Sequence, residues 1–175
     1  MKSRNLKIFL ILIFIIFLTG CRQKEDNDDG EKIQYKSNEY LSWSVKMADS
    51  EMERRGNSLA FGGSNPKAKW QYTTGLFLKS MLDLWQVTND SKYFEYVKNV
   101  MDSFIEENGS IKTYKMTEYN LDKINPGKVL LSLYKKTGSE KYKLAADILY
   151  QQLQNQPRTL GGGFWHKQIY PWQMW

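Results

Sequence analysis

A repeated pair of helical segments most limits what this chain can fold into. The stretch TNDSKYFEYV at 88–97 returns as TGSEKYKLAA at 137–146, and Thr, Lys and Tyr keep their places in both copies. Each copy follows a Leu-rich segment and opens another segment with helical apolar spacing. The repeating unit is therefore predicted to be a helix, a tight turn and a second helix. Such units bury their apolar faces by stacking on one another, so an all-α array of helical hairpins is expected.

Apolar spacing and capping residues predict where the helices lie. Leu41, Val45, Ala48 and Met52 indicate a first helix that Asn38 caps and Gly56 ends. A second helix is expected at 73–87; because it is apolar nearly all round, it should be buried. Further helices are expected at about 91–107, 128–136 and 139–155. Their predicted caps and stops are Asp90, Asn125-Pro126, Gly138 and Ser139.

Three long aromatic segments separate the predicted hairpins, at 61–72, 108–127 and 157–173. They alternate with the short turns TNDSK and TGSEK, so a hairpin array places the long segments on one rim and the short turns on the other. Long loops inside a compact domain are usually functional, which makes the rim of long segments the predicted functional face. The periodicity leaves open whether the array is an open solenoid or a closed ring.

The first 20 residues have the layout of a secretory signal. Basic residues precede an unbroken apolar run at 8–18, which at ~1.5 Å per residue covers only about half of a bilayer core. The run ends in Leu18-Thr19-Gly20-Cys21, which resembles the lipobox of bacterial lipoproteins, where cleavage precedes a cysteine that carries diacylglycerol. Cys21 is the sole cysteine and is the predicted lipidation site, the alternative being an incidental thiol after an ordinary signal.

Residues 21–37 are expected to be a flexible tether and 38–175 the folded domain, because 22–32 has no apolar residue to support an ordered structure. The chain is thus expected to be exported and lipid-anchored to a bacterial membrane, on the periplasmic side or the cell surface. Its 25 basic and 19 acidic residues give a net charge of +6, which falls to +3 without the signal. The remaining charges alternate in sign, so nucleic acid is not an expected partner.

The long segments hold the residues suited to chemistry. Aromatic faces beside polar side chains suit sugars, although Trp165, Tyr170 and Trp172 could instead cap the core beneath their loop. His166 is the sole histidine; it can exchange protons near neutral pH or be structural, and no second histidine or nearby cysteine supports a metal site. Asp122 precedes a helix and is either a cap or an acid–base group, with Glu118 a weaker second carboxylate.

Two motifs in these segments resemble unsaturated rhamnogalacturonyl hydrolases, which form glycoside hydrolase family 105. They are NLDKINPGK at 120–128, followed by LLSLY at 130–134, and QPRTLGGGFWHKQIYPWQMW at 156–175. The related unsaturated glucuronyl hydrolases of family 88 share a looser version. The resemblance extends from about Trp43 to Trp175.

The resemblance implies an (α/α)6 toroid, of which this chain would hold roughly half. It also implies removal of a 4,5-unsaturated uronic acid from the non-reducing end of pectin-derived (rhamnogalacturonan) oligosaccharides, by hydration of the vinyl-ether double bond and without a metal or organic cofactor. Asp122 and His166 are then expected at the catalytic site. Tyr72, in WQYTTG at 70–75, is expected to line the pocket, and Trp165 and Trp175 to contact substrate.

In the family, Gln-Met-Trp is followed by Leu-Asp-Gly, whose aspartate is the main proton donor, whereas this sequence ends at Trp175. The 175-residue chain is therefore expected to be inactive and poorly folded, because half a ring exposes apolar hairpin faces. One alternative is a non-catalytic carbohydrate-binding lipoprotein that uses the aromatic rim alone. Another is a different toroid enzyme, such as a sugar epimerase, although those rely on several histidines.

Overall fold

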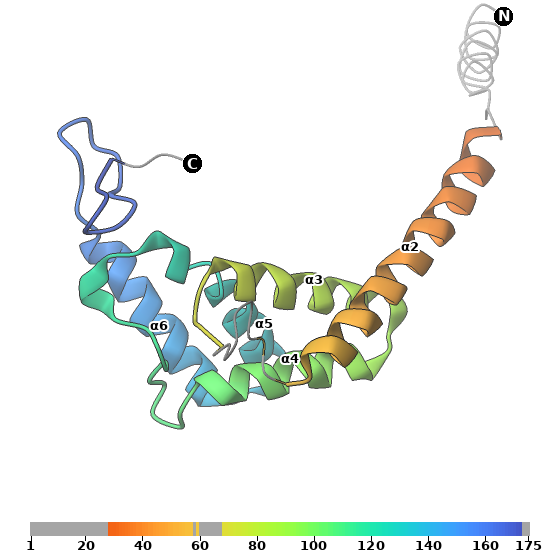
Figure 1. Cartoon of the computed structure of the whole chain (residues 1–175), viewed down its shortest axis with the longest axis horizontal. Coiled ribbons are helices and arrows are strands. Elements are labelled where there is room, and N and C mark those ends of the chain that lie inside the picture. Colours follow the sequence, from red (N-terminus) through yellow and green to blue (C-terminus); the bar gives the residue numbers. More distant parts are fainter. Residues whose placement is uncertain (1–27, 58, 60–67, 173–175) are drawn as a thin grey trace, which may run out of the picture. The chain divides into compact units, whose positions relative to one another are not determined.

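The computed structural model describes residues 28–57, 59 and 68–172, with side chains described from residue 38. Its α-helices are α2 (Asp28–Arg55), α3 (Tyr72–Thr88), α4 (Ser91–Phe104), α5 (Gly127–Thr137) and α6 (Glu140–Asn155), joined by the short 3-10 helices η1 (Met116–Glu118) and η2 (Leu121–Lys123) (Figure 1). The described residues hold no strand beyond isolated bridges. The predicted all-α fold is confirmed, and residues from Trp43 onward form one compact unit.

The first described helix begins earlier than predicted. α2 starts at Asp28, so Asn38 lies inside the helix and is not its cap, and the described part of the predicted tether is helical. The predicted end is confirmed, because Gly56 has a left-handed φ of 54° and donates its N–H to the carbonyl of Met52 at 2.9 Å.

The two short turns are built in the same way, which confirms the repeat. Thr88 donates its hydroxyl to the carbonyl of Leu84 and accepts the N–H of Asp90. Thr137 makes the equivalent bonds to Leu133 and Ser139. The residue after each threonine is left-handed, with φ of 54° at Asn89 and 69° at Gly138. Asp90 caps α4 by accepting the N–H of Lys92, as predicted, whereas Ser139 stands at the N-cap of α6 without a side-chain bond.

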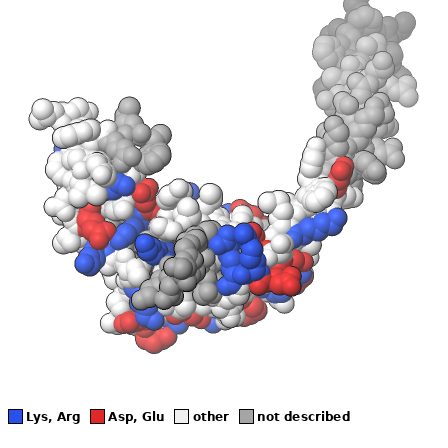
Figure 2. Space-filling model, viewed as in Figure 1, with Lys and Arg blue, Asp and Glu red and all other residues white. Residues whose placement is uncertain are grey.

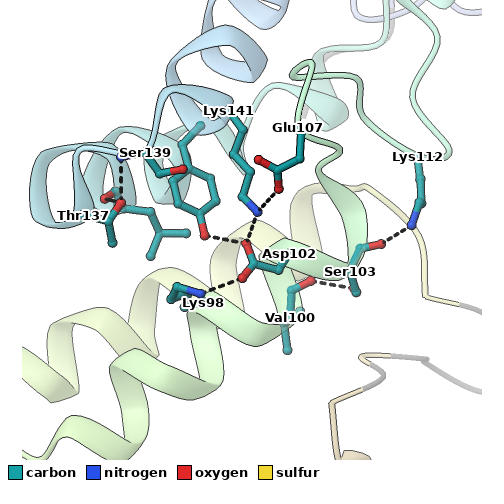
Figure 3. A network of polar contacts seen from close by, with 11 residues as sticks. Lys98, Val100, Asp102, Ser103, Glu107, Lys112, Thr137, Ser139 and Lys141 are labelled. Carbon is teal, nitrogen blue, oxygen red and sulfur yellow. Dashed lines mark hydrogen bonds and ion pairs between the residues drawn. The ribbon is translucent and has the colours of Figure 1, made fainter.

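Neighbouring hairpins pack through corresponding helices. α3 packs on α4, α5 on α6, and α3 on α5. An aspartate on one helix also binds a neighbouring Lys and Tyr in the first turn of the second helix of the next hairpin. Asp49 of α2 accepts Lys92 and Tyr93, and Asp102 of α4 accepts Lys141 and Tyr142. We call these two groups the first and second clasps; the second is drawn in Figure 3.

Two predictions about the central helices need correction. α3 buries Leu78, Met81 and Leu82, but Leu76 and Val87 are exposed, because in the described part of the chain its packing partners are α4 and α5. α5 begins at Gly127 and has Pro126 as its N-cap, so Asn125 does not cap it with its side chain.

The described parts of the long segments meet, as predicted. The indole N–H of Trp70 donates to the carbonyl of Lys123 at 2.8 Å, and the N–H of Leu121 donates to the carbonyl of His166 at 2.9 Å. The segments before α3, between α4 and α5, and after α6 are thereby joined to one another.

Basic and acidic side chains lie interspersed on the face seen in Figure 2. Ion pairs between helices, such as Lys92 with Asp49 and Lys141 with Asp102, belong to this pattern. Among the helices that the structure describes, none combines the length and hydropathy needed to cross a bilayer. The apolar segment 8–18, Cys21 and Trp175 lie outside the described residues.

Candidate active site

Asp122 lies in a short 3-10 turn within the segment between α4 and α5. The side chain of Asn120 caps this turn and accepts the N–H of Asp122 at 3.0 Å. This contact fixes the main chain without using the carboxylate, whose side chain remains 28% exposed. Asp122 is therefore not the cap, and its charge is available to other groups.

His166 is buried against this carboxylate. Its Nε2 lies 3.5 Å from Oδ2 of Asp122, and its side chain is only 9% exposed. The ammonium of Lys167 lies 3.7 Å from the same oxygen. The structure thus brings together the two residues that the sequence singled out, and it adds the ammonium of Lys167 beside the carboxylate.

Main-chain hydrogen bonds join the two loops that carry these side chains. The N–H of Leu121 donates to the carbonyl of His166, and the N–H of Gln168 donates to the carbonyl of Glu118 at 3.0 Å. The loop of His166 is closed on itself by a bond from its own N–H to the carbonyl of Pro171 at 3.2 Å. These main-chain hydrogen bonds therefore fix the positions of Asp122 and His166 relative to each other.

Asp122 opens onto a pocket of about 370 Å³. This volume lies at the small end of the range for small-molecule sites. Tyr72, half-exposed at the start of α3, lines the same pocket, and its contact with substrate stays a prediction. The lining residues are Ala68, Lys69, Trp70, Gln71, Tyr72, Thr113, Asn120, Asp122 and Lys123. A second hollow of about 340 Å³ shares Asn120 and is also lined by Glu118, Lys167, Gln168 and Ile169.

Sequence reasoning missed the residues that hold one wall of the pocket. The fully buried Trp70 donates its indole N–H to Lys123 and its backbone N–H to the hydroxyl of Thr113 at 2.9 Å. The ammonium of Lys123 in turn donates to the carbonyl of Thr113 and to the carboxylate of Glu118. The position of Trp70 two residues before Tyr72 was the available signal, but its partners lie more than 40 residues away.

The carboxylate of Glu118 is paired with Lys123, whose Nζ lies 2.7 Å from Oε2. Glu118 therefore stabilises the loop and is not a second carboxylate of the pocket that Asp122 lines. Within the described residues, no three His, Cys, Asp or Glu side chains gather in a way that could hold a metal ion.

Most aromatic side chains of the last described loop are exposed to solvent and do not pack on the core. Tyr170 and Trp172 are exposed, at 55% and 82%, so they do not cap the core beneath their loop. Phe164 is also exposed and stacks against the guanidinium of Arg158 at 3.5 Å. Trp165 is half-buried and is tied into the loop by its backbone, and its contact with substrate stays a prediction.

The arrangement combines one accessible carboxylate, a buried imidazole behind it and aromatic side chains around it. Carboxylate and imidazole are side chains suited to acid–base chemistry, and a hollow with aromatic walls and polar groups suits one sugar ring.

The sequence profile of a family described as Glycosyl Hydrolase Family 88 matches residues 43–175. The chain belongs to glycosyl hydrolase family 88. The matched range runs from the second half of α2 through both hairpins and the site loops. The resemblance inferred from the two motifs is thereby confirmed.

This family 88 chain is also similar to a solved glycoside hydrolase of family 105 from C. acetobutylicum ATCC 824, with 40% sequence identity and a TM-score of 0.67. The similarity covers 76% of this chain and 35% of that protein, so the chain spans about a third of the length of the solved enzyme. The helical hairpins are accordingly part of an (α/α)6 toroid, which decides between the ring and the open solenoid.

Proposed function

We propose that this chain belongs to a hydrolase that removes a 4,5-unsaturated uronic acid from the non-reducing end of pectin-derived rhamnogalacturonan oligosaccharides. The carrying observation is the Asp122 carboxylate, which faces a sugar-sized pocket and contacts a buried imidazole. Membership of a glycoside hydrolase family supports the reaction class. The motifs of the two site loops support the unsaturated uronate as substrate.

In the proposed reaction, a carboxylic acid protonates the vinyl-ether double bond and water adds to the adjacent carbon. The resulting hemiketal opens and releases the remaining sugar, so the glycosidic bond breaks without direct attack on it. Asp122 is the proposed active-site carboxylate that holds the reacting ring and water. His166, whose Nε2 lies 3.5 Å from Oδ2 of Asp122, is proposed to contact the substrate near the uronate.

We also propose, from the family resemblance, that the main proton donor is the aspartate of a Leu-Asp-Gly motif that follows Gln-Met-Trp in the family. The 175-residue chain would then not turn the substrate over. The nucleotide sequence after codon 175 tests this directly. Turnover by the 175-residue chain, read as loss of the ultraviolet absorbance of the conjugated double bond, would contradict it.

The substrate proposal is tested by calorimetric titration of the 175-residue chain with an unsaturated rhamnogalacturonan disaccharide and with its saturated counterpart. We expect tighter binding of the unsaturated sugar. Asp122→Asn should weaken it about 10-fold or more, since a hydrogen bond to a charged group contributes about 1.5–3 kcal/mol.

The matched control is Asp147→Asn, which removes an exposed carboxylate on α6 that pairs with Lys143. This variant should bind as the unchanged chain does. Equal affinity for both sugars, or an Asp122→Asn variant that binds normally, would rule the substrate proposal out.

A non-catalytic carbohydrate-binding function remains the second candidate, because Phe164, Tyr170 and Trp172 present exposed aromatic faces. It requires sugar binding that survives Asp122→Asn and is lost in Trp172→Ala. The calorimetric comparison above therefore separates the two functions.

We further propose that Cys21 carries diacylglycerol and anchors the chain to a bacterial membrane. The support is the lipobox-like Leu18-Thr19-Gly20-Cys21 after an apolar run of signal length. Fractionation of cells that express the Cys21→Ser variant tests this proposal.

A further inference from the structure

A buried glutamine lies between the two loops of the candidate site. Gln156 is the C-cap of α6 and is 4% exposed. Its side-chain amide donates to two carbonyl groups, that of Tyr119 at 2.7 Å and that of Trp165 at 2.8 Å. Tyr119 lies three residues before Asp122, and Trp165 directly precedes His166. One amide group therefore holds the main chain of both loops.

The orientation of this amide is fixed by its partners. Carbonyl oxygens only accept hydrogen bonds, so the NH2 end of Gln156 must face them. Its oxygen is then the acceptor for the side-chain amide of Gln152 at 3.0 Å. The oxygen of Gln152 in turn accepts the hydroxyl of Tyr114 at 2.7 Å. We call Tyr114, Gln152 and Gln156 the amide relay.

The relay has a single direction, because a donor stands at one end and two acceptors at the other. Burial raises the pKa of Tyr114 to about 12, so its hydroxyl stays protonated and donates over the whole physiological range. Gln152 is fully buried, so bulk water does not reach its side-chain oxygen or its amide nitrogen to replace their hydrogen-bond partners. A buried polar network of this kind is rigid when every member is satisfied.

The backbone at Tyr119 supports the same conclusion. Tyr119 has a left-handed φ of 46°, a conformation that costs a non-glycine residue free energy. The carbonyl held in this strained turn is the one that Gln156 binds. On the other loop, the carbonyl of Pro157, the residue after Gln156, accepts the N–H of Trp165 at 2.9 Å. The end of α6 is thereby hydrogen-bonded to the loop that carries His166.

We propose that Gln156 is the positioning residue of the Asp122–His166 pair, held in the required orientation by Gln152 and Tyr114. The sequence did not indicate this role: Gln156 is the first residue of the second motif, but nothing in its spacing distinguishes it or Gln152 from other polar residues at the end of a helix. That the Asp122–His166 pair takes part in catalysis rests on the proposed function, whereas its positioning by Gln156 does not. The experiment therefore measures the surroundings of the His166 imidazole and not the activity.

His166 is the sole histidine, so the proton on Cε1 of its imidazole gives a single assignable signal in the untagged 175-residue chain. We expect Gln156→Met, which keeps the length but cannot donate, to shift this signal by an amount similar to that in Asp122→Asn. Gln152→Met should shift it less, and Tyr114→Phe least, because each lies one link further from the loops. The matched control Gln154→Met, on the exposed side of α6, should leave the signal unchanged.

A structural role alone predicts a different order. Gln152 and Gln156 are almost equally buried, so their replacement would then lower the unfolding midpoint and move the imidazole signal to similar extents. The proposal is overturned if a folded Gln156→Met variant keeps the unchanged signal, or if Gln152→Met shifts it as much.

If Gln156→Met does not fold, Tyr114→Phe decides, since it removes one hydroxyl. It should give a small shift of the imidazole signal, with Tyr150→Phe, an exposed tyrosine of α6, giving none. The absence of a shift in Tyr114→Phe would then overturn the proposal. Failure of the substrate proposal would appear as lost sugar selectivity with the imidazole shifts intact, so the two failures are distinguishable.

Discussion

At the residue scale, the close approach of α3 to the start of α5 depends on one missing side chain. Gly75 is buried in α3, and a Cβ atom built on it would lie 2.6 Å from Oδ1 of Asn125 and 2.6 Å from the backbone nitrogen of Pro126. A Cβ atom is essentially never found this close to a backbone atom to which it is not bonded. The same contact places the end of the Asp122 segment against α3, so packing at Gly75 also supports the pocket.

We expect Gly75→Ala to lower the free energy of unfolding by about 1–3 kcal/mol, the usual cost of overpacking a rigid contact. Alanine favours a helix over glycine by about 1 kcal/mol, but this gain does not remove a clash with backbone. Denaturant unfolding followed by circular dichroism measures the change.

Gly127→Ala is the matched control for Gly75→Ala. Gly127 opens α5, and its added Cβ would meet only the end of the Leu149 side chain at 3.1 Å, which can move. Its effect should stay within about 0.5 kcal/mol. Equal losses in the two variants would show that the backbone contact at Gly75 is not what requires glycine.

At the element scale, the two clasps join successive hairpins with different strength. Asp102 accepts Lys98 at 2.8 Å, Tyr142 at 2.6 Å and Lys141 at 3.1 Å, and Lys141 also binds Glu107 (Figure 3). The side chain of Asp102 is 27% exposed, against 44% for Asp49 in the first clasp. The second clasp is therefore less screened by water and should contribute more to stability.

We expect Asp102→Asn to lower the free energy of unfolding by about 1–3 kcal/mol at neutral pH, because it leaves partly buried donors without their charged acceptor. Asp49→Asn is the control and should lose less, since Asp49 and its partner Lys92 are more exposed, while both clasps contain a buried tyrosine. Denaturant midpoints of both variants check this, and a larger loss in Asp49→Asn would contradict the ranking of the clasps.

The contribution of Asp102 should also depend on pH. Burial by itself would raise the pKa of Asp102, but hydrogen bonds from Lys98, Tyr142 and Lys141 outweigh it and lower the pKa below its ordinary value. A carboxylate with a lowered folded-state pKa stabilises the fold above the unfolded pKa of about 4 and loses this effect as the pH falls through the folded value. The difference between the unchanged chain and Asp102→Asn should therefore shrink below about pH 4, and a constant difference would argue against the ion pairs.

At the scale of the whole molecule, one structural unit appears twice and the site lies on the side of its long loops. The short turns make the same hydrogen bonds in the two copies, and each clasp holds a Lys–Tyr pair against an aspartate of a neighbouring helix. The loops between α4 and α5 and after α6 differ in sequence and meet around Asp122. A stacked array thereby separates a constant structural side from a variable functional side.

The proposed membrane anchor also concerns the whole chain. In bacterial cells, we expect the unchanged chain to be found in the membrane fraction and to incorporate labelled fatty acid. Cys21→Ser should lose the label and leave the membrane fraction, because a single apolar run of signal length does not replace two acyl chains. The Ser3→Ala variant, changed before the apolar run, is the control and should behave as the unchanged chain does. Membrane retention of Cys21→Ser at the unchanged level would exclude the lipid anchor.

The sequence by itself determined the elements and the residues of interest. Apolar spacing and caps placed α3, α4 and α6 close to their observed bounds, and the repeat from Thr88 to Thr137 predicted two like turns. These features depend on residues within a few positions of one another, so they are readable locally. The two motifs singled out Asp122 and His166, which the structure brings within 3.5 Å.

Tertiary structure decided which of these groups are held and by what. The contact of Asp122 with His166 and Lys167 and the amide relay from Tyr114 to Gln156 join residues from different segments, and Lys123 braces Glu118 within one of them. The start of α2 at Asp28 and the exposure of Leu76 likewise differ from the local pattern. Spacing along the chain sets which face a side chain occupies, but burial and hydrogen-bond partners depend on what packs against that face, and this is set only when the segments assemble.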